Sequence, residues 1–275
     1  MIELSVSNIL NCKGFGLDSL DAFLSLLKKY DIKGIELALN CVFSEPTNIS
    51  QHELDRLRTL LEKYSVITVS LHSLTFTRPE LELFNNTEGL ERLIEYISAY
   101  VLLARKLDCR NIVFGSGKAR KTYEKTQEEC NAIFNVFLKE IDSICENIFF
   151  NIEPLPKIFC EYLNSYNHAF NILEKGNFKN IGIQLDLKSL FETDSFQIHT
   201  LLAKKDFFHH VHVSNIDFSP PSEKDFDKHR KMIDFLNNSE FDGFVSMEAI
   251  ARKSNITLAE IEMYLTDFKK IYSFK

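Results

Sequence analysis

Short apolar runs alternate along the chain with longer segments whose apolar residues recur at helical spacing. The short runs predict β-strands, because each is bounded by turn or loop residues. They cover residues 2–7, 34–38, 66–71, 111–115, 149–153, 181–186, 210–213 and 244–248. The amphipathic segments predict helices over residues 18–30, 88–107, 126–146, 195–204, 225–238 and 257–272, with one more beginning at residue 50 and another ending near residue 176. Helix starts are marked by Asp18 and by two capping boxes, Ser50 with Glu53 and Thr126 with Glu129.

This strict alternation predicts a parallel sheet with right-handed helical crossovers. Eight strand–helix units in 275 residues favour an α/β protein of the (β/α)8 TIM-barrel type, with one domain spanning residues 1–275. An open Rossmann-like sheet is the alternative, but Gly14 and Gly16 supply only GxG after the first strand. The segment Gly115-Ser116-Gly117-Lys118 lacks the spacing of a P-loop.

Composition narrows the class of protein. The net charge of −7 argues against a nucleic-acid binder that relies on bulk positive charge. The N-terminus has no basic leader region, and no apolar run approaches the roughly 18 residues of a membrane span, so we expect a soluble cytoplasmic protein. Without any CxxC pair, we expect all six cysteines to be reduced thiols. They are Cys12, Cys41, Cys109, Cys130, Cys145 and Cys160.

Four successive predicted strands end in a residue of metal-ligand type: Glu153, Asp186, His212 and Glu248. The carboxyl ends of barrel strands meet at one mouth, which would bring these side chains together. Three carboxylates repel one another unless a cation offsets their charge. Oxygen ligands with one imidazole suit Mn²⁺, Mg²⁺, Co²⁺ or Fe²⁺, and Zn²⁺ less specifically. His210 shares a strand face with His212 and is the alternative imidazole ligand.

Further candidates lie at the same predicted mouth. Glu36 and His72 end two earlier strands, and we expect them to bind substrate or to support the site by hydrogen bonding. Lys118 and Arg120 follow the fourth strand and could hold a phosphate or carboxylate of the substrate. The alternative for both is a solvated charge run.

The four ligand-type residues in their strand context resemble the xylose isomerase-like TIM barrel superfamily, over essentially the whole chain. That group includes ketose 3-epimerases, other sugar isomerases and endonuclease IV. The segments most similar to its sugar phosphate isomerase/epimerase proteins are Gly34–Glu36, Val113–Ser116, Ile152–Pro154, His212–Ser214 and Val245–Glu248. The resemblance implies a divalent metal (Mn, Mg, Co or Zn) held by Glu153, Asp186, His212 and Glu248. It also makes Glu153 and Glu248 the acid–base pair that acts on a metal-stabilised enediolate.

The sequence departs from the family at several positions. Many relatives have a histidine where Ser189 stands, and the epimerases have an arginine in the segment that here reads Asn215-Ile216-Asp217. Asp227-Lys228-His229 resembles a D-x-H ligand pair of endonuclease IV, which makes His229 a further candidate at the mouth, and His72 matches another of its ligands. Two other histidines of that zinc site are missing.

Three functions follow as hypotheses. The first is a metal-dependent isomerase or epimerase acting on a sugar, sugar phosphate or related hydroxy-carbonyl. The second is an endonuclease IV-like phosphodiesterase, and the third is a non-catalytic sugar-binding barrel of a polysaccharide biosynthesis cluster. The expected partner is a small carbohydrate, with no membrane and no nucleic acid, and the sequence leaves a homo-oligomer open.

Overall fold

The computed structural model describes residues 2–12, 16–193, 195–250 and 256–273, so Gly14 of the GxG segment lies outside the described residues. Its strands form a closed barrel in sequence order, and β8 pairs in parallel with β1. The strands are β1 (Glu3–Ser7), β2 (Gly34–Leu37), β3 (Ile67–Leu71), β4 (Asn111–Phe114), β5 (Phe149–Ile152), β6 (Ile181–Asp186), β7 (Phe208–Val213) and β8 (Phe244–Met247). The predicted (β/α)8 barrel is therefore confirmed.

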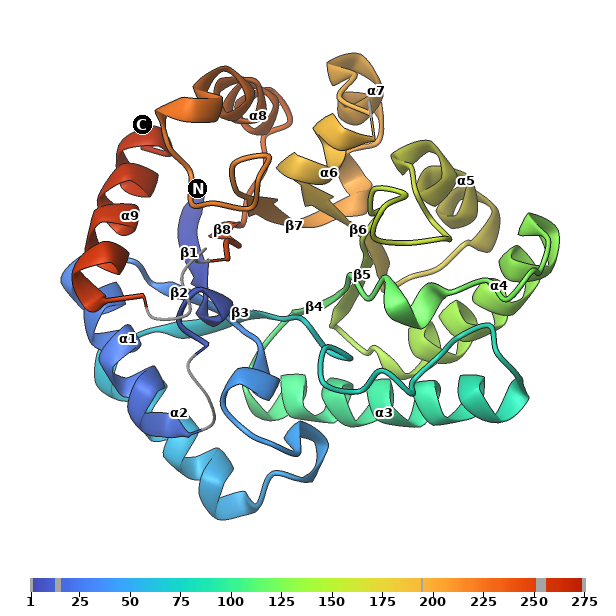
Figure 1. Ribbon diagram of the computed structural model, residues 1–275, viewed down its shortest axis with the longest axis horizontal. Coiled ribbons are helices and arrows are strands. Elements are labelled where there is room, and N and C mark those ends of the chain that lie inside the picture. The colour runs from blue at the N-terminus through green and yellow to red at the C-terminus, as the bar shows by residue number, and fades with distance from the viewer. Residues whose placement is uncertain (1, 13–15, 194, 251–255, 274–275) are drawn as a thin grey trace.

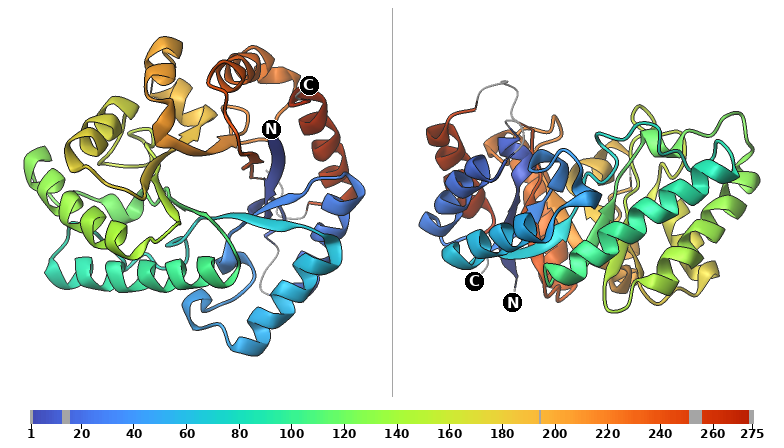
Figure 2. Two further views of the ribbon diagram at one scale, coloured as in Figure 1. Left: turned by 180° about the vertical axis from the view of Figure 1, so that it is seen from behind. Right: turned by 90° about the horizontal axis from the view of Figure 1, so that it is seen from below.

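Helices surround the strands as an outer ring (Figures 1 and 2). They are α1 (Leu17–Lys29), α2 (Gln51–Tyr64), α3 (Thr87–Lys106), α4 (Gln127–Ile144), α5 (Tyr166–Gly176), α6 (Leu187–Glu192), α7 (Ile198–Ala203), α8 (Phe226–Asn238) and α9 (Leu258–Ile271). Short 3-10 turns lie at 8–11, 39–41, 46–48, 118–120, 205–207 and 223–225. None of the helices in the described part of the chain is long and apolar enough to cross a membrane.

Helix starts show where local sequence decided the structure. Both predicted capping boxes are present, at Ser50 and at Thr126. Asp18 lies in the first turn of α1 and does not cap it, because the N-cap is Gly16. Helix α6 was not predicted, since it begins immediately after β6. Asp186 ends the strand and also caps the helix by accepting a hydrogen bond from the Ser189 amide at 2.6 Å.

The apolar core fills the layer between the strands and the helices, whereas the barrel interior carries polar side chains. Glu36 on β2 contacts His212 on β7, and these strands are not neighbours, so both side chains point into the barrel. Deeper inside, the Ser246 hydroxyl contacts His210 Nε2 at 3.0 Å and the Ser5 hydroxyl. Buried polar groups need such partners, and the interior therefore supports a polar site at the mouth.

The cysteine prediction was wrong for two residues. Cys12 and Cys41 form a disulfide with a Cα–Cα distance of 5.2 Å. They follow the neighbouring strands β1 and β2, and this proximity in space is not visible in their sequence separation of 29. The other four cysteines are free, as expected, and all four are buried: Cys109, Cys130, Cys145 and Cys160.

Candidate metal and catalytic site

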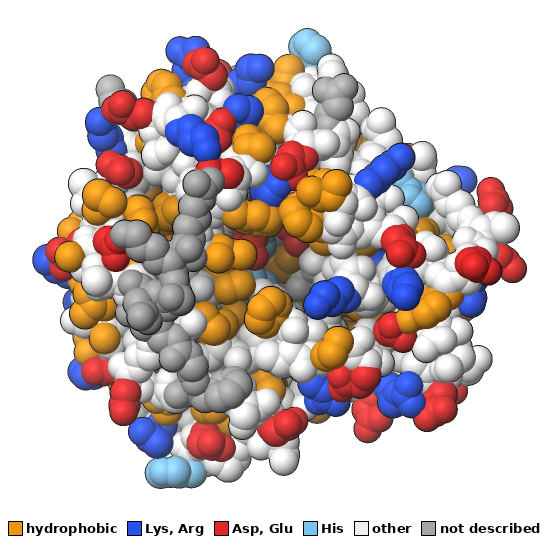
Figure 3. Space-filling model, viewed as in Figure 1, with side chains coloured by type: hydrophobic (Ala, Val, Ile, Leu, Met, Phe, Trp, Pro, Cys, Tyr) orange, Lys and Arg blue, Asp and Glu red, His pale blue; other side chains and the backbone are white. Residues whose placement is uncertain are grey.

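The structure brings Glu153, Asp186, His212 and Glu248 together at the carboxyl ends of β5 to β8. One ligand atom from each residue lies within 4.8 Å of the others. Glu153, Asp186 and Glu248 line a cavity of about 290 Å³ at the mouth of the barrel. Figure 3 shows hydrophobic side chains around the centre of this face, with acidic side chains visible in the hollow between them.

Glu36 fixes the orientation of the His212 ring. His212 Nε2 lies 2.8 Å from Glu36 Oε1, and the carboxylate is fully buried. His212 Nδ1 lies 3.0 Å from Glu248 Oε2 and 3.5 Å from Glu153 Oε1, yet it makes no hydrogen bond within the described part of the chain. With Nε2–H donated to Glu36, Nδ1 faces the carboxylates and can hold either a proton or a metal ion. Glu36 thus lies behind His212 and not in the lining of the cavity, and of the two roles expected for it this position favours support of the site by hydrogen bonding.

His210 lies below His212 on the same face of β7. Its Nε2 lies 3.3 Å from Glu36 Oε1, and Glu36, His210 and His212 form a second group with ligand atoms within 4.8 Å. All three residues are buried in the barrel, whereas the four-residue group opens to the cavity. The geometry therefore favours His212 over His210 as the imidazole of the mouth.

His72 holds Glu248 from the β3 side. Its Nδ1 donates to Glu248 Oε1 over 3.1 Å, and its Nε2 contacts the Ser7 hydroxyl at 2.7 Å. His72 also lines the cavity, so it can both position Glu248 and face a bound ligand. The buried contact with Ser7 keeps the imidazole from rotating away.

Glu153 depends on two residues that follow β4. Arg120 is fully buried, and its Nη1 donates to the Glu153 carbonyl oxygen over 2.9 Å, while its Nε donates to the Ser116 carbonyl over 3.3 Å. A Cβ added at Gly115 would lie 1.8 Å from Glu153 Oε2, so glycine provides the space that this carboxylate occupies. Arg120 does not line the cavity, and its predicted contact with an anionic group stays a prediction.

The carboxylates differ in their proton affinity. Burial raises the pKa of Asp186 to about 7, and the charge of Glu153 acts in the same direction. Burial also raises the pKa of Glu153, although contact with His212 opposes it. Burial acts on Glu248 as well, but attraction to the charge of His212 and the hydrogen bond from His72 outweigh it and hold the pKa of Glu248 below its usual range. Two glutamates in one site therefore have pKa values shifted in opposite directions.

The residues fit a divalent cation. The buried carboxylates of Glu153 and Asp186 and the partly exposed carboxylate of Glu248 converge with an imidazole nitrogen that has no hydrogen-bond partner among the described residues. Such a group is costly unless a cation compensates its charge. Burial lowers the pKa of His212, but the charges of Glu36 and Glu248 outweigh it and raise that pKa well above its usual value. A bound ion would take the place of this proton. The oxygen-rich donor set suits Mn²⁺, Mg²⁺ or Co²⁺, and also Zn²⁺.

The remaining candidates are divided between the cavity and the interior. Lys118 and Ser189 line the cavity. His229 does not, because it is buried with Nε2 donating to Asn215 Oδ1 over 3.1 Å and Nδ1 2.7 Å from the Tyr272 hydroxyl. Burial lowers its pKa to about 4, so this imidazole stays neutral.

Sequence reasoning missed several residues of the cavity wall. Lys188, Phe159 and Phe218 all line it. A signal for Lys188 was present, since it lies two positions after the candidate ligand Asp186. The two phenylalanines gave none, because surface loops often carry single apolar residues.

The chain belongs to the xylose isomerase-like TIM barrel family, whose model matches residues 24–268. No curated protein matches the chain. Among solved structures, it is similar to D-psicose 3-epimerase from Clostridium cellulolyticum, solved with D-tagatose. The TM-score is 0.78 and the identity 12%, with 99% of this chain and 97% of that chain covered.

Two further solved structures show the same fold. An AP endonuclease, family 2, from Brucella melitensis has a TM-score of 0.76 at 16% identity and covers 98% of this chain and 99% of its own. The IOLI protein with a bound zinc atom has a TM-score of 0.74 at 19% identity, with 98% and 96% covered. At these identities the similarity establishes the fold alone.

Proposed function

We propose that the protein is a divalent-metal-dependent isomerase or epimerase that acts on a sugar, sugar phosphate or related hydroxy-carbonyl by proton transfer at carbon. The observation that carries this proposal is the convergence of Glu153, Asp186, His212 and Glu248 on one point of a small-molecule cavity. These four residues would hold the ion. When bound, it would polarise the substrate carbonyl and so acidify the neighbouring C–H group.

Glu153 and Glu248 are proposed as the proton-transfer pair. Their pKa values are shifted in opposite directions, up for Glu153 by burial and down for Glu248 despite burial. Such a pair can supply an ionised base and a protonated acid in the same site. His72 keeps Glu248 in place, and Arg120 fixes the backbone of Glu153.

Two solved neighbours agree with this proposal. One was solved as a D-psicose 3-epimerase with D-tagatose, and another carries a zinc atom. The endonuclease alternative receives less support, because His229 of the D-x-H segment bonds to Asn215 and Tyr272 and lies outside the cavity lining.

The test combines metal analysis with proton exchange. The protein is loaded with Mn²⁺, and ketoses and ketose phosphates are incubated with it in D₂O while deuterium at carbon is followed by NMR. We expect about one ion per chain and exchange that falls about 10²- to 10⁴-fold in Glu153→Gln and Glu248→Gln. Glu161→Gln, outside this cavity, is the matched control and should exchange at the normal rate.

Each other outcome contradicts the proposal in its own way. About three zinc ions per chain with cleavage at abasic sites would identify a phosphodiesterase. Sugar binding without exchange would identify a non-catalytic barrel. Exchange that survives in Glu153→Gln and in Glu248→Gln would remove both residues from the mechanism.

A further inference from the structure

The cavity above the acidic cluster has a cationic wall. Lys188 lies on α6, two residues after Asp186, and is 3% exposed. Its ammonium nitrogen lies 5.2 Å from the ring centroid of Phe159 and 4.8 Å from that of Phe218. All of these residues line the same cavity, so the buried ammonium is part of the ligand's surroundings.

The neighbours of Lys188 do not accept hydrogen bonds from all three donors of its ammonium group. An ammonium group has three donors, and burying it is costly unless it is paired and hydrogen-bonded. In the described ranges, its one hydrogen bond goes to Glu192, one turn further along α6. The two aromatic faces contribute cation–π attraction but accept no strong hydrogen bond. An incoming anion could therefore add to the Glu192 contact or replace it.

Charge is distributed unevenly along the cavity. Glu153, Asp186 and Glu248 make one part acidic, whereas Lys188 and Lys118 contribute cations from the segments after β6 and β4. A ligand with hydroxyl and carbonyl groups at one end and an anionic group at the other complements both parts. A neutral sugar would leave the Lys188 ammonium with Glu192 as its sole anionic partner among the described residues.

We infer that Lys188 is a specificity residue that binds an anionic substituent of the substrate, so that the substrate is a sugar phosphate or sugar acid. The part of this inference that concerns the reacting end of the substrate rests on the proposed function. The anion contact does not, because it depends on residues outside the candidate metal cluster.

The experiment compares matched ligands that differ in one anionic group. Calorimetry measures binding of D-ribulose 5-phosphate against D-ribulose, D-fructose 6-phosphate against D-fructose, D-glucuronate against D-glucose, and inorganic phosphate alone. The proteins are the Mn²⁺-loaded wild type, Lys188→Met, Lys188→Arg and the control Lys157→Met, whose lysine is exposed on the neighbouring loop. We expect the wild type to bind at least one anionic ligand about 10-fold or more tightly than its neutral partner.

The ratio of the affinity for the anionic ligand to that for its neutral partner should fall to near one in Lys188→Met. It should persist in Lys188→Arg and Lys157→Met. Lys188→Arg also keeps the inference testable if the methionine variant does not fold, because the longer guanidinium should change the preference between phosphate and carboxylate. Equal binding of anionic and neutral ligands by the wild type overturns the inference. So does a preference that survives in Lys188→Met, which would leave Lys188 as a structural ion pair.

Failure of this inference can be told apart from failure of the proposed function. Glu153→Gln should lose proton exchange and retain the preference for the anionic ligand. Lys188→Met should lose the preference and retain the metal. If exchange is absent while the Lys188-dependent preference remains, the anion site stands and the isomerase proposal fails.

Discussion

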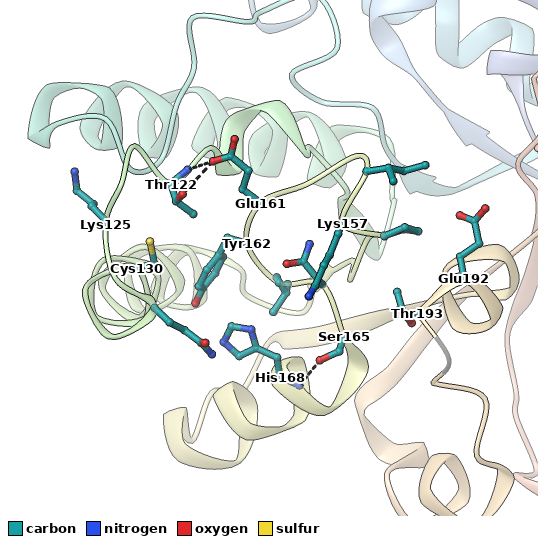
Figure 4. Close-up of a pocket in the computed structure, with 15 residues that line it drawn as sticks. Thr122, Lys125, Cys130, Lys157, Glu161, Tyr162, Ser165, His168, Glu192 and Thr193 are labelled. Carbon is teal, nitrogen blue, oxygen red and sulfur yellow. Dashed lines mark hydrogen bonds between the residues drawn. The ribbon is translucent and has the colours of Figure 1, made fainter.

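Two cavities lie on either side of the segment that follows β5, and Pro156 lines both. The larger, about 940 Å³, is bordered by the starts of α4 and α5 (Figure 4). One of its carboxylates is already paired within the wall, since Glu161 accepts hydrogen bonds from the amide and hydroxyl of Thr122. The smaller cavity, about 290 Å³, contains like-charged buried carboxylates. Unbalanced charge, and not volume, therefore distinguishes the candidate active site.

The histidines of the two regions show the same contrast. The carboxylates around His212 raise its pKa well above the usual value, although burial opposes them. His168 of the larger cavity has no such carboxylates acting on it, and burial lowers its pKa. The surroundings of His212 thus favour a positive charge on or next to its imidazole, whereas the packing around His168 favours the neutral imidazole.

Among substitutions outside the four ligand-type residues, the largest effect should come from Gly115→Ala. The new Cβ would displace Glu153 Oε2, which lies 1.8 Å from its position. Because a 1 Å displacement of a reacting group can cost about 100-fold in rate, we expect proton exchange to fall by about that factor. The control is Gly176→Ala at the end of α5, where the Cβ would meet the Phe178 ring at 1.9 Å. If both alanine variants lose exchange equally, the effect is general loss of stability and not a change at the mouth.

A smaller effect is expected from Glu36→Gln. The amide can still accept the His212 proton, but it loses the charge that makes the imidazole a stronger ligand. Mn²⁺ affinity should fall about 10- to 100-fold, as measured by titration calorimetry. Glu161→Gln makes the same change in the larger cavity and should leave the affinity unaltered. An unchanged affinity in Glu36→Gln would show that Glu36 only fills space inside the barrel.

The fold and the meeting of the four ligand-type residues follow from sequence because both depend on periodicity. Strand ends recur in register around a barrel, so Glu153, Asp186, His212 and Glu248 must reach one mouth. Helix α6 was missed because Asp186 is both the last residue of β6 and the N-cap of α6. No loop residues separate the two elements and mark the boundary in the sequence.

Side-chain direction could not be predicted in the same way. Three predicted candidates follow or end barrel strands, yet their polar groups bond to buried partners and do not line the cavity. They are Glu36, Arg120 and His229. Which way such a side chain turns depends on hydrogen bonds between distant segments, and a single sequence does not encode these as a pattern. The disulfide between Cys12 and Cys41 was missed for the same reason.

The smallest effect concerns acid stability and tests the larger cavity. His168 Nε2 donates to Asn131 Oδ1 over 2.9 Å, and burial lowers its pKa from 6.5. The unfolded chain therefore binds more protons at this residue than the folded one just below pH 6.5, so its contribution to stability is lost as pH falls through that range. His168→Gln should lose less unfolding free energy than wild type between pH 7.5 and 5.5, measured by urea denaturation with the same metal content. His52→Gln, at an exposed position on α2, should follow the wild type. A steeper loss in His168→Gln would mean that His168 is charged in the folded protein and that the larger cavity holds an unrecognised anion.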